Sequence, residues 1–270
     1  MDLNALAQRA VLGDRAALEQ VCLEVRDPIY RLALRMLGSP HDAEDAAQDI
    51  LVHVVNHLSQ FQGRAQLMTW VYTIATRHLL RTRQRTAEAR VRGAAPFAEW
   101  LDTHLSHPAY EPTQQAELRL LEEECRLACT QGMLLCLTRE QRVALLLGDV
   151  LSLSDREGAE ICEVSPATFR QRLARARKTI RFIIGRRCGL VDANNPCSCV
   201  RQVGACVAQG ILNPSQPMFA QLPREGARVA RAASQLDELG RFAELLGTED
   251  FQAPASVWSY VRLTAPDLVN

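Results

Sequence analysis

The spacing of the apolar residues is the feature that most constrains the fold of this 270-residue chain. Between residues 43 and 58, alanine, isoleucine, leucine and valine recur at every third or fourth position, as they do on the buried face of an α-helix. The same period returns from about 67 to 85 and, in pieces, from 117 to 187. Runs of strand character are few, and aromatic residues make up only 5% of the chain. We therefore expect an all-α protein.

Helix boundaries are signalled by proline, glycine and small polar residues. Asp27 and Pro28 have the order of a capping residue followed by a first helical position, so they predict a helix that ends near Gly38. Ser39 and Pro40 repeat that signal for the next helix. Two further starts, at Thr138-x-x-Gln141 and Ser154-x-x-Glu157, have the spacing of a capping box.

The helical period is interrupted in two places, and these interruptions predict the domain organisation. Between 86 and 113 it fades while Pro96, Pro108 and Pro112 accumulate, which indicates an irregular, mobile linker. Beyond Arg187 follows a tail with several prolines and one weak helical stretch near 228–246. We expect two small helical domains and two additional segments: domain 1–86, linker 87–114, domain 115–187 and C-terminal extension 188–270.

The composition limits the classes of protein to which this chain can belong. The 31 basic and 31 acidic residues cancel, so net charge alone does not indicate a nucleic-acid partner. The N-terminal residues lack the basic and apolar regions of a signal peptide, and no apolar run approaches the roughly 20 residues of a membrane span. We expect a cytoplasmic protein, in which nine cysteines indicate free thiols, metal ligation or redox chemistry rather than a disulfide framework.

A helix-turn-helix is predicted from residue 155 to about residue 181. A short helix, a turn at Glu163-Val164 and a cap at Ser165-Pro166 precede a longer helix, which carries an apolar stripe. From 164 to 191 there are eight Lys or Arg residues and no acid. Such a helix suits the DNA major groove, where Arg pairs with guanine and Gln with adenine; the alternative is a solvated amphipathic helix. The stripe comprises Phe169, Leu173, Ala176 and Ile180, and the outward residues include Arg170, Gln171, Arg175, Lys178 and Arg181.

Two further charged helices precede it. Asp42, Asp45 and Asp49 share one face of the helix after Pro40, where they either stabilise the helix dipole or bind a basic partner helix; the pattern leaves both open. The next helix carries Trp70 and Tyr72 ahead of a basic stripe at Arg77, Arg81 and Arg85. Aromatic rings and a basic stripe together can bind single-stranded DNA. We interpret Trp70 as a core residue, and Tyr72 and the stripe as DNA candidates.

These segments resemble a known family. YRLALRMLGSPHDAEDAAQDI with TWVYTIATRHLLRTRQR resembles the second conserved region of extracytoplasmic-function sigma factors. LTREQRVALLLGDVLSLSDREGAEICEVSPATFRQRLARARKTI resembles their fourth region. Together the matches span about residues 10–86 and 115–187, in the expected order. The resemblance implies a non-enzymatic factor that binds core RNA polymerase and promoter DNA, with no required cofactor and with an anti-sigma protein as a further candidate partner.

The resemblance also implies roles for particular residues. In the family, the acidic helix binds the clamp helices of the polymerase β′ subunit and the fourth region binds the β flap. The polymerase-binding residues would be Asp42, Glu44, Asp45 and Asp49. Binding of melted −10 DNA would involve the loop at about 61–68, starting at Phe61, and then Tyr72, Arg77, His78, Arg81 and Arg85. Binding of −35 DNA would involve Thr168, Arg170, Gln171, Arg175 and Lys178.

The chain departs from the family pattern at three positions. Many members carry Asn at the position of Arg77 and Asp near Arg81, so the −10 sequence preference cannot be copied from relatives. Gly158 replaces a commonly apolar residue in the first helix of the helix-turn-helix, at an expected cost of about 1 kcal/mol of helix stability.

The extension carries four cysteines that could bind Zn²⁺ tetrahedrally. Their spacing lacks the paired Cys-x-x-Cys pattern, so a thiol switch and plain packing remain open, and regulation of the factor in cis is a hypothesis. We interpret the remaining five cysteines as packing residues in apolar helices. The extension's cysteines are Cys188, Cys197, Cys199 and Cys206, and the other five are Cys22, Cys125, Cys129, Cys136 and Cys162.

Two other classes of function are weighed against the sigma factor. A helix-turn-helix regulator that acts on duplex DNA without sigma activity would need neither an acidic docking helix nor a melting loop. A metal or thiol enzyme would need a catalytic constellation, but HExxH, phosphate-loop and Gly-x-Ser-x-Gly patterns do not occur in the sequence.

Overall fold

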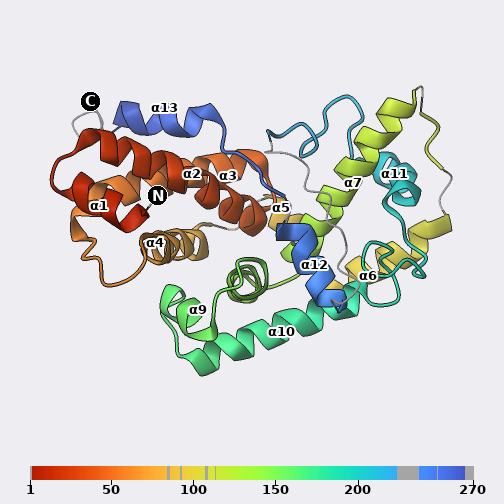
Figure 1. Cartoon of the computed structure of the whole chain (residues 1–270). Helices are drawn as coiled ribbons and strands as arrows, with labels where there is room; N and C mark the ends of the chain where they lie inside the picture. Colours follow the sequence, from red (N-terminus) through yellow and green to blue (C-terminus); the bar gives the residue numbers. More distant parts are fainter. Residues whose placement is uncertain are drawn as a thin grey trace. The chain divides into compact units, whose positions relative to one another are not determined.

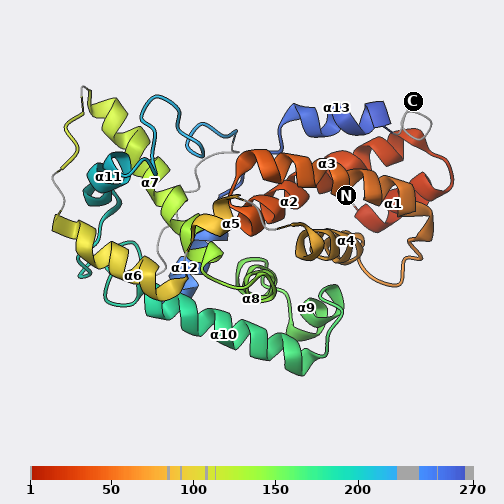
Figure 2. The same cartoon turned by 180° about the vertical axis from the view of Figure 1, so that it is seen from behind.

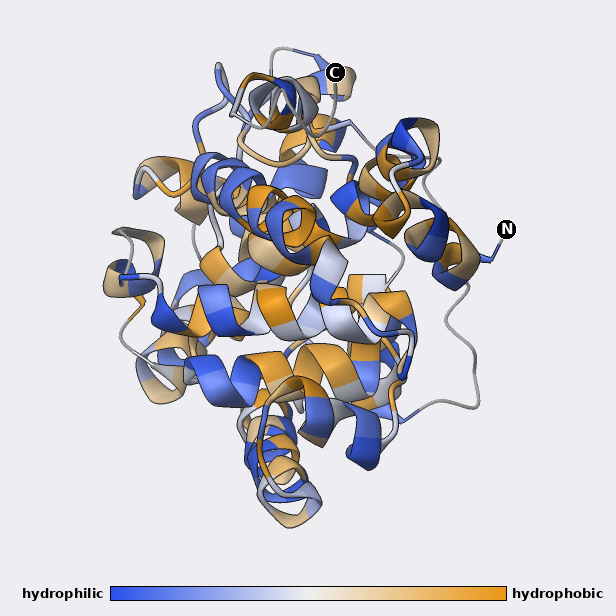
Figure 3. Ribbon diagram, turned by 90° about the vertical axis from the view of Figure 1, so that its left-hand side faces the viewer, coloured by the Kyte–Doolittle hydropathy of each residue, from blue (hydrophilic) through white to orange (hydrophobic). Residues whose placement is uncertain are grey.

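The computed structural model describes residues 2–83, 86–91, 93–106, 109–112, 114–223, 237–247 and 249–264. Throughout these ranges the regular secondary structure is helical (Figure 1), and Cys188 and Cys197 form an isolated β-bridge. The helices are amphipathic, with hydrophobic and hydrophilic residues alternating along each ribbon in Figure 3. The expected all-α class is confirmed, and the chain divides into two compact units.

Unit 1 combines the described parts of 1–85, 153–171 and 251–270. Helices α2 and α3 pack along each other and form its centre, with α1 on α2 and α4 on both. The C-terminal helix α13 lies on α3 and α2, as both Figure 1 and Figure 2 show. The bounds are α1 (Leu3–Val11), α2 (Arg15–Leu37), α3 (Pro40–His57), η1 (Leu58–Gln60), α4 (Leu67–Arg81), α9 (Asp155–Ile161), the start of α10 (Pro166–Ile184) and α13 (Ala255–Thr264).

Helix α2 begins at Arg15, so the helix start predicted at Pro28 is wrong. The cap is Asp14, and Pro28 lies inside the helix. A proline in a helix interior costs about 3 kcal/mol. Its neighbours Val25 and Ile29 are completely buried, and burying each such side chain contributes about 1.5–3 kcal/mol. Packing of this face therefore outweighs the local preference of proline.

The junction between α2 and α3 follows the prediction. Gly38 ends α2 in the left-handed conformation with φ 69°, which glycine adopts without strain. Ser39 then caps α3, where its side chain accepts the N–H of Asp42 at 3.3 Å. The buried face of α3 is the predicted one: Ala43, Ala46, Ala47, Ile50, Leu51, Val54 and Val55.

Unit 2 combines the described parts of 86–152 and 172–250. Its bounds are α5 (Thr86–Arg90), α6 (Ala94–Thr103), η2 (His104–Ser106), α7 (Gln115–Leu135), α8 (Arg139–Leu145), η3 (Leu146–Val150), the remainder of α10, α11 (Cys199–Ala208) and α12 (Glu238–Gly247). The segment expected to be an irregular linker thus contains two helices. Ala98 and Leu101 of α6 are buried, and Pro96 stands in its first turn, where proline is tolerated.

The extension beyond Arg187 packs into this unit. Helix α11 lies along α7 in both views of the chain, and the two share an apolar cluster that includes Leu121, Val203 and Leu212. A buried carboxylate, Glu124 on α7, accepts the backbone N–H groups of residues 218, 219 and 220 at 2.8, 2.8 and 2.7 Å. The loop after α11 is therefore fixed to α7 by polar as well as apolar contacts.

A buried ion cluster joins α5 to α8. Arg142 is 2% exposed, and its guanidinium donates to Glu88 at 3.1 Å and to two backbone carbonyls at 2.8 and 3.0 Å. Arg139 donates to the same carboxylate at 2.9 Å. Glu88 is thus the counter-charge of a cation that has almost no access to water.

Removing this carboxylate should destabilise unit 2 strongly. Glu88→Ala leaves Arg142 buried without its counter-charge, which we expect to lower the free energy of unfolding by about 3–5 kcal/mol. Denaturant unfolding followed by helical circular dichroism measures the change. Glu99→Ala, at an exposed position of α6, is the matched control and should change it by less than about 0.5 kcal/mol. Equal midpoints for the two variants would contradict the assigned role of Glu88.

Candidate polymerase- and DNA-binding surfaces

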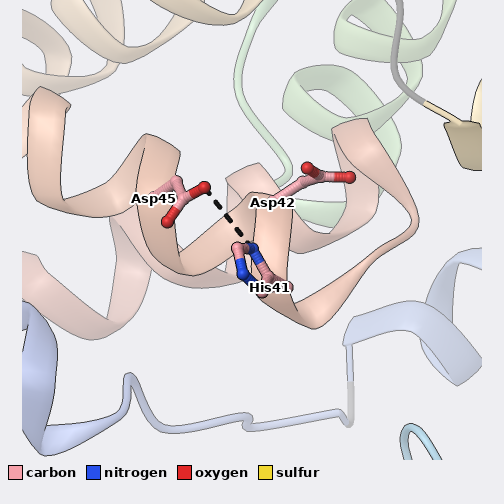
Figure 4. Close-up of side chains that lie close together, drawn as sticks. All are labelled: His41, Asp42 and Asp45. Carbon is pink, nitrogen blue, oxygen red and sulfur yellow. Dashed lines mark ion pairs between the residues drawn. The ribbon is translucent and has the colours of Figure 1, made fainter.

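The acidic residues of α3 form an exposed face on the first half of that helix. The side chains of Asp45 and Asp49 are 47% and 58% exposed, and Asp42 precedes them on the same face. His41 lies beside them, with its Nδ1 3.4 Å from a carboxylate oxygen of Asp45 (Figure 4). Because the opposite face of α3 is buried, these carboxylates are held outward and remain accessible to a basic partner.

The fourth predicted acid has a different environment. Glu44 points toward α13, where the hydroxyl of Ser256 donates to its carboxylate. The N–H of Ala253, just before α13, donates to the carboxylate of Asp27 on α2 at 3.0 Å. These contacts could not be predicted from the sequence, since no local pattern relates residues more than 200 positions apart.

A groove of about 480 Å³ opens beside α3 and α4. Three of the predicted −10 residues line it, namely Arg77, His78 and Arg81. His78 also connects the two helices, with its Nε2 4.0 Å from Asp49. The structure therefore brings the basic residues of α4 together at one surface. Arg85 lies outside the described residues.

The two aromatic residues of α4 have the reverse of the expected placement, because Trp70 and not Tyr72 lines the groove. Trp70, assigned to the core, is half-buried and lines the groove, and its ring lies 5.7 Å from that of the buried Phe61. Tyr72 is not among the groove residues; burial raises the pKa of its phenol, while Arg31 and Arg35 of α2 are close enough to oppose that rise. Trp70 is therefore the better placed of the two for contact with a base.

Two histidines that sequence analysis missed complete the groove. His53 and His57 lie one turn apart on α3, and their rings stack at 5.2 Å with an interplanar angle of 16°. Their spacing of four residues at the end of an amphipathic helix was the available signal. Flat rings beside arginines are suited to binding bases and phosphates together.

The helix-turn-helix forms as predicted. Ser154 and Glu157 make the capping box of α9, and Ser165 accepts the N–H of Thr168 at 3.1 Å at the start of α10. The predicted stripe of α10 is buried. Of the proposed −35 residues, Thr168 is half-buried, and the exposed ones are Arg170, Gln171, Arg175 and Lys178.

The turn of this motif contacts α4 within unit 1. Glu163 occupies the left-handed region with φ 54° and binds the guanidinium of Arg77 at 2.6 and 3.2 Å. The hydrogen bonds from Arg77 lower the pKa of the Glu163 carboxyl. The two predicted DNA-binding elements are thus joined by an ion pair that neutralises a cation of the groove.

Gly158 has a packing role that could not be inferred from its low helix propensity. A Cβ at this position would lie 2.2, 2.5 and 2.7 Å from carbons of the Phe169 ring. Such distances are far below van der Waals contact, so glycine lets α9 approach α10 closely.

The four cysteines proposed as Zn²⁺ ligands do not form a closed tetrahedral set. Across the described residues, the one group of three or more His, Cys, Asp or Glu side chains whose ligand atoms lie within 4.8 Å of one another is His41, Asp42 and Asp45. Cys206 instead faces Cys125 of α7, with the two sulfurs 3.9 Å apart.

Comparisons with known proteins match both halves of this arrangement. Residues 23–88 match the family model for Sigma-70 region 2, and residues 127–180 match that for Sigma-70, region 4. The chain belongs to the extracytoplasmic-function family of RNA polymerase sigma factors. It is 28% identical over 178 residues to the ECF RNA polymerase sigma factor SigC of Mycobacterium tuberculosis, covering 66% of this chain and 89% of that protein.

A second curated relative agrees with this assignment. The ECF sigma factor SigW of Bacillus subtilis is 27% identical over 170 residues, which cover 63% of this chain and 89% of SigW. Among solved structures, the sigma factor RpoE bound to the anti-sigma factor NepR from Bartonella quintana is similar, with 20% identity, a TM-score of 0.41 and coverage of 62% of this chain and 95% of that one. This membership does not favour a duplex-DNA regulator without sigma activity. No described helix has the length and apolar character required to span a bilayer.

The contact of Gly158 with Phe169 gives a test of how this sigma factor builds its helix-turn-helix. Gly158→Ala should gain about 1 kcal/mol of helix propensity but lose more through overpacking, which typically costs about 1–3 kcal/mol. We expect a net loss of stability, measured as a lower Tm, together with weaker binding to promoter DNA. The double variant Gly158→Ala/Phe169→Leu should recover part of the loss. A Tm raised by Gly158→Ala alone would show that the contact is not tight.

Proposed function

We propose that this sigma factor binds core RNA polymerase through the acidic face of α3 and recognises promoter DNA with α4 and α10. The observation that carries the proposal is the division of α3 into a buried apolar face and an exposed acidic one, beside a groove lined by arginines. Carboxylates on an exposed face attract a basic partner helix, and the clamp helices of the β′ subunit would be such a partner. The same compact unit then provides a surface for DNA next to the docking face.

The groove beside α4 is proposed to hold the melted −10 element. Trp70, His53 and His57 present flat rings that can stack on unpaired bases. Arg81 can neutralise the backbone phosphates that accompany those bases, and Arg77 can do the same once its ion pair with Glu163 opens. The binding energy gained on the exposed strand offsets the cost of unpairing, so the sigma factor melts DNA without catalysing a reaction.

Helix α10 is proposed to recognise the −35 element in the major groove. Arg170 and Gln171 are exposed in its first turns, where side chains of a recognition helix contact base edges. Arg175 and Lys178 continue the exposed face and suit phosphate contacts. This region would also bind the β flap of polymerase. The factor would act in the cytoplasm, where an anti-sigma protein is a further proposed partner.

The docking face can be tested by charge reversal. Asp45→Lys/Asp49→Lys should weaken binding to core polymerase at least tenfold, because two attractive charges become repulsive. It should also abolish run-off transcription from genomic promoter fragments. Glu19→Lys, at an exposed acid on α2, is the matched control and should transcribe like the parent. Full transcription by the double variant, or none by the parent chain with or without its extension, would contradict the proposal.

We further propose that the end of the extension regulates polymerase binding in cis. Helix α13 packs on α3 and α2, with Val257 and Val261 completely buried and Ser256 bonded to Glu44. Glu44 belongs to the proposed polymerase-binding set, so α13 and the β′ clamp would compete for this side of α3. Displacement of α13 would then accompany formation of the active complex.

A matched pair of substitutions on α13 tests this competition. Val257→Asp places a charge at a buried contact and should release α13, raising the affinity for core polymerase several-fold. Leu263→Asp changes a side chain that is 80% exposed and should leave the affinity unchanged. Affinity is measured by titration of labelled factor with core polymerase. Identical affinities for both variants and the parent would rule out competition, and a loss in Val257→Asp alone would show that α13 supports binding.

A further inference from the structure

The turn of the helix-turn-helix carries a glutamate at a backbone position that favours glycine. Glu163, between α9 and α10, has φ 54°, in the left-handed region that residues with a Cβ enter only with strain. The turn is closed by backbone hydrogen bonds, from Glu163 N–H to the carbonyl of Glu160 at 3.1 Å and from Val164 N–H to that of Ala159 at 3.0 Å. Glycine could form the same bonds without strain, so the glutamate side chain has to be explained by its contacts.

The contact that this side chain makes is an ion pair with α4. Nε and Nη2 of Arg77 donate to the two different oxygens of the Glu163 carboxylate, at 3.2 and 2.6 Å. These hydrogen bonds are the main cause of the lowered pKa of the carboxyl, and the positive charges of Arg77 and Arg81 add to it. The side chains of Arg77 and Glu163 are 44% and 54% exposed, so an anion in solution can reach the pair.

The guanidinium of Arg77 can bind a phosphate in the same way. Its planar fork of N–H groups matches the two oxygens of a carboxylate and two oxygens of a phosphodiester alike. Arg77 lines the groove beside α4 together with Arg81 and Trp70, where the backbone of a melted strand would bring its phosphates. The carboxylate of Glu163 therefore occupies the position at Arg77 that a DNA phosphate needs.

We propose that Glu163 is an internal counter-ion of the groove, and that a backbone phosphate of the melted −10 strand replaces it at Arg77. This role rests on the proposed function of the groove, which it deepens by assigning a residue that opposes strand binding. In the free factor the pair neutralises one cation of the groove, which lowers the affinity for any single strand irrespective of its sequence. A strand must displace the carboxylate, which favours strands whose bases also stack on the rings of the groove.

The salt dependence of strand binding distinguishes this role from a structural one. Each phosphate that a protein cation neutralises releases counter-ions from the DNA, and on single strands this contributes about 0.7 to the slope of log K against log salt concentration. In the parent chain, the Glu163 carboxylate that is set free attracts a cation from solution, which offsets the ions released at Arg77. Without Glu163 the contribution of Arg77 appears in full, so the slope should become steeper by up to about 0.7.

The experiment measures binding of a fluorescent single-stranded oligothymidine to the full-length protein over a range of salt concentrations. Glu163→Gln keeps the size of the side chain and removes its charge, so it should raise the affinity about two- to fivefold at low salt and steepen the slope. Glu160→Gln removes an equal charge at an exposed position one turn earlier on α9; it is the matched control and should bind like the parent. Glu163→Gly, which suits the turn, should behave like Glu163→Gln, and circular dichroism checks the fold of each variant. In an Arg77→Gln background, Glu163→Gln should have no effect.

Three outcomes would overturn the counter-ion role, and Arg81→Gln, which removes another cation of the groove, separates them. If Arg81→Gln weakens binding of the oligothymidine while Glu163→Gln binds like the parent, the groove holds the strand but Glu163 does not compete with it. Equal gains in Glu163→Gln and Glu160→Gln, with an unchanged slope, would show that only net charge matters. Unchanged binding in both Arg81→Gln and Glu163→Gln would place the strand elsewhere and would contradict the proposed function of the groove as well.

Discussion

The packing of α3 on α2 is the interaction on which the candidate surfaces of unit 1 depend. Burial of one face of α3 holds its carboxylates outward, and it also makes α3 a wall of the groove beside α4. The same packing provides the seat of α13. Docking, DNA binding and the proposed regulation therefore all depend on one helix pair, in which Pro28 is accommodated because the surrounding apolar face is completely buried.

The extension is held in both units by carboxylates that accept backbone N–H groups. Glu124 binds the loop after α11, and Asp27 binds the residue that precedes α13 by one proline. A tethered helix has an effective local concentration of the order of millimolar, so a weak intrinsic interaction is sufficient to keep α13 on α3. In the proposed competition, polymerase displaces α13 when it binds α3 more favourably than α13 does. Its apparent affinity is then the intrinsic affinity multiplied by the fraction of chains in which α13 is released.

How far the sequence predicts this arrangement depends on the range of the interactions involved. Capping boxes and the buried stripe of α10 are local, and they were predicted correctly. Pro28 was misassigned because tertiary burial outweighed a local signal. Trp70 and Tyr72 differ by two positions on one helix, and which of them faces the groove depends on how α4 packs on α2. The contact of Cys206 with Cys125 could not be predicted, because it depends on which segment of the extension lies on α7, and periodicity carries no such information.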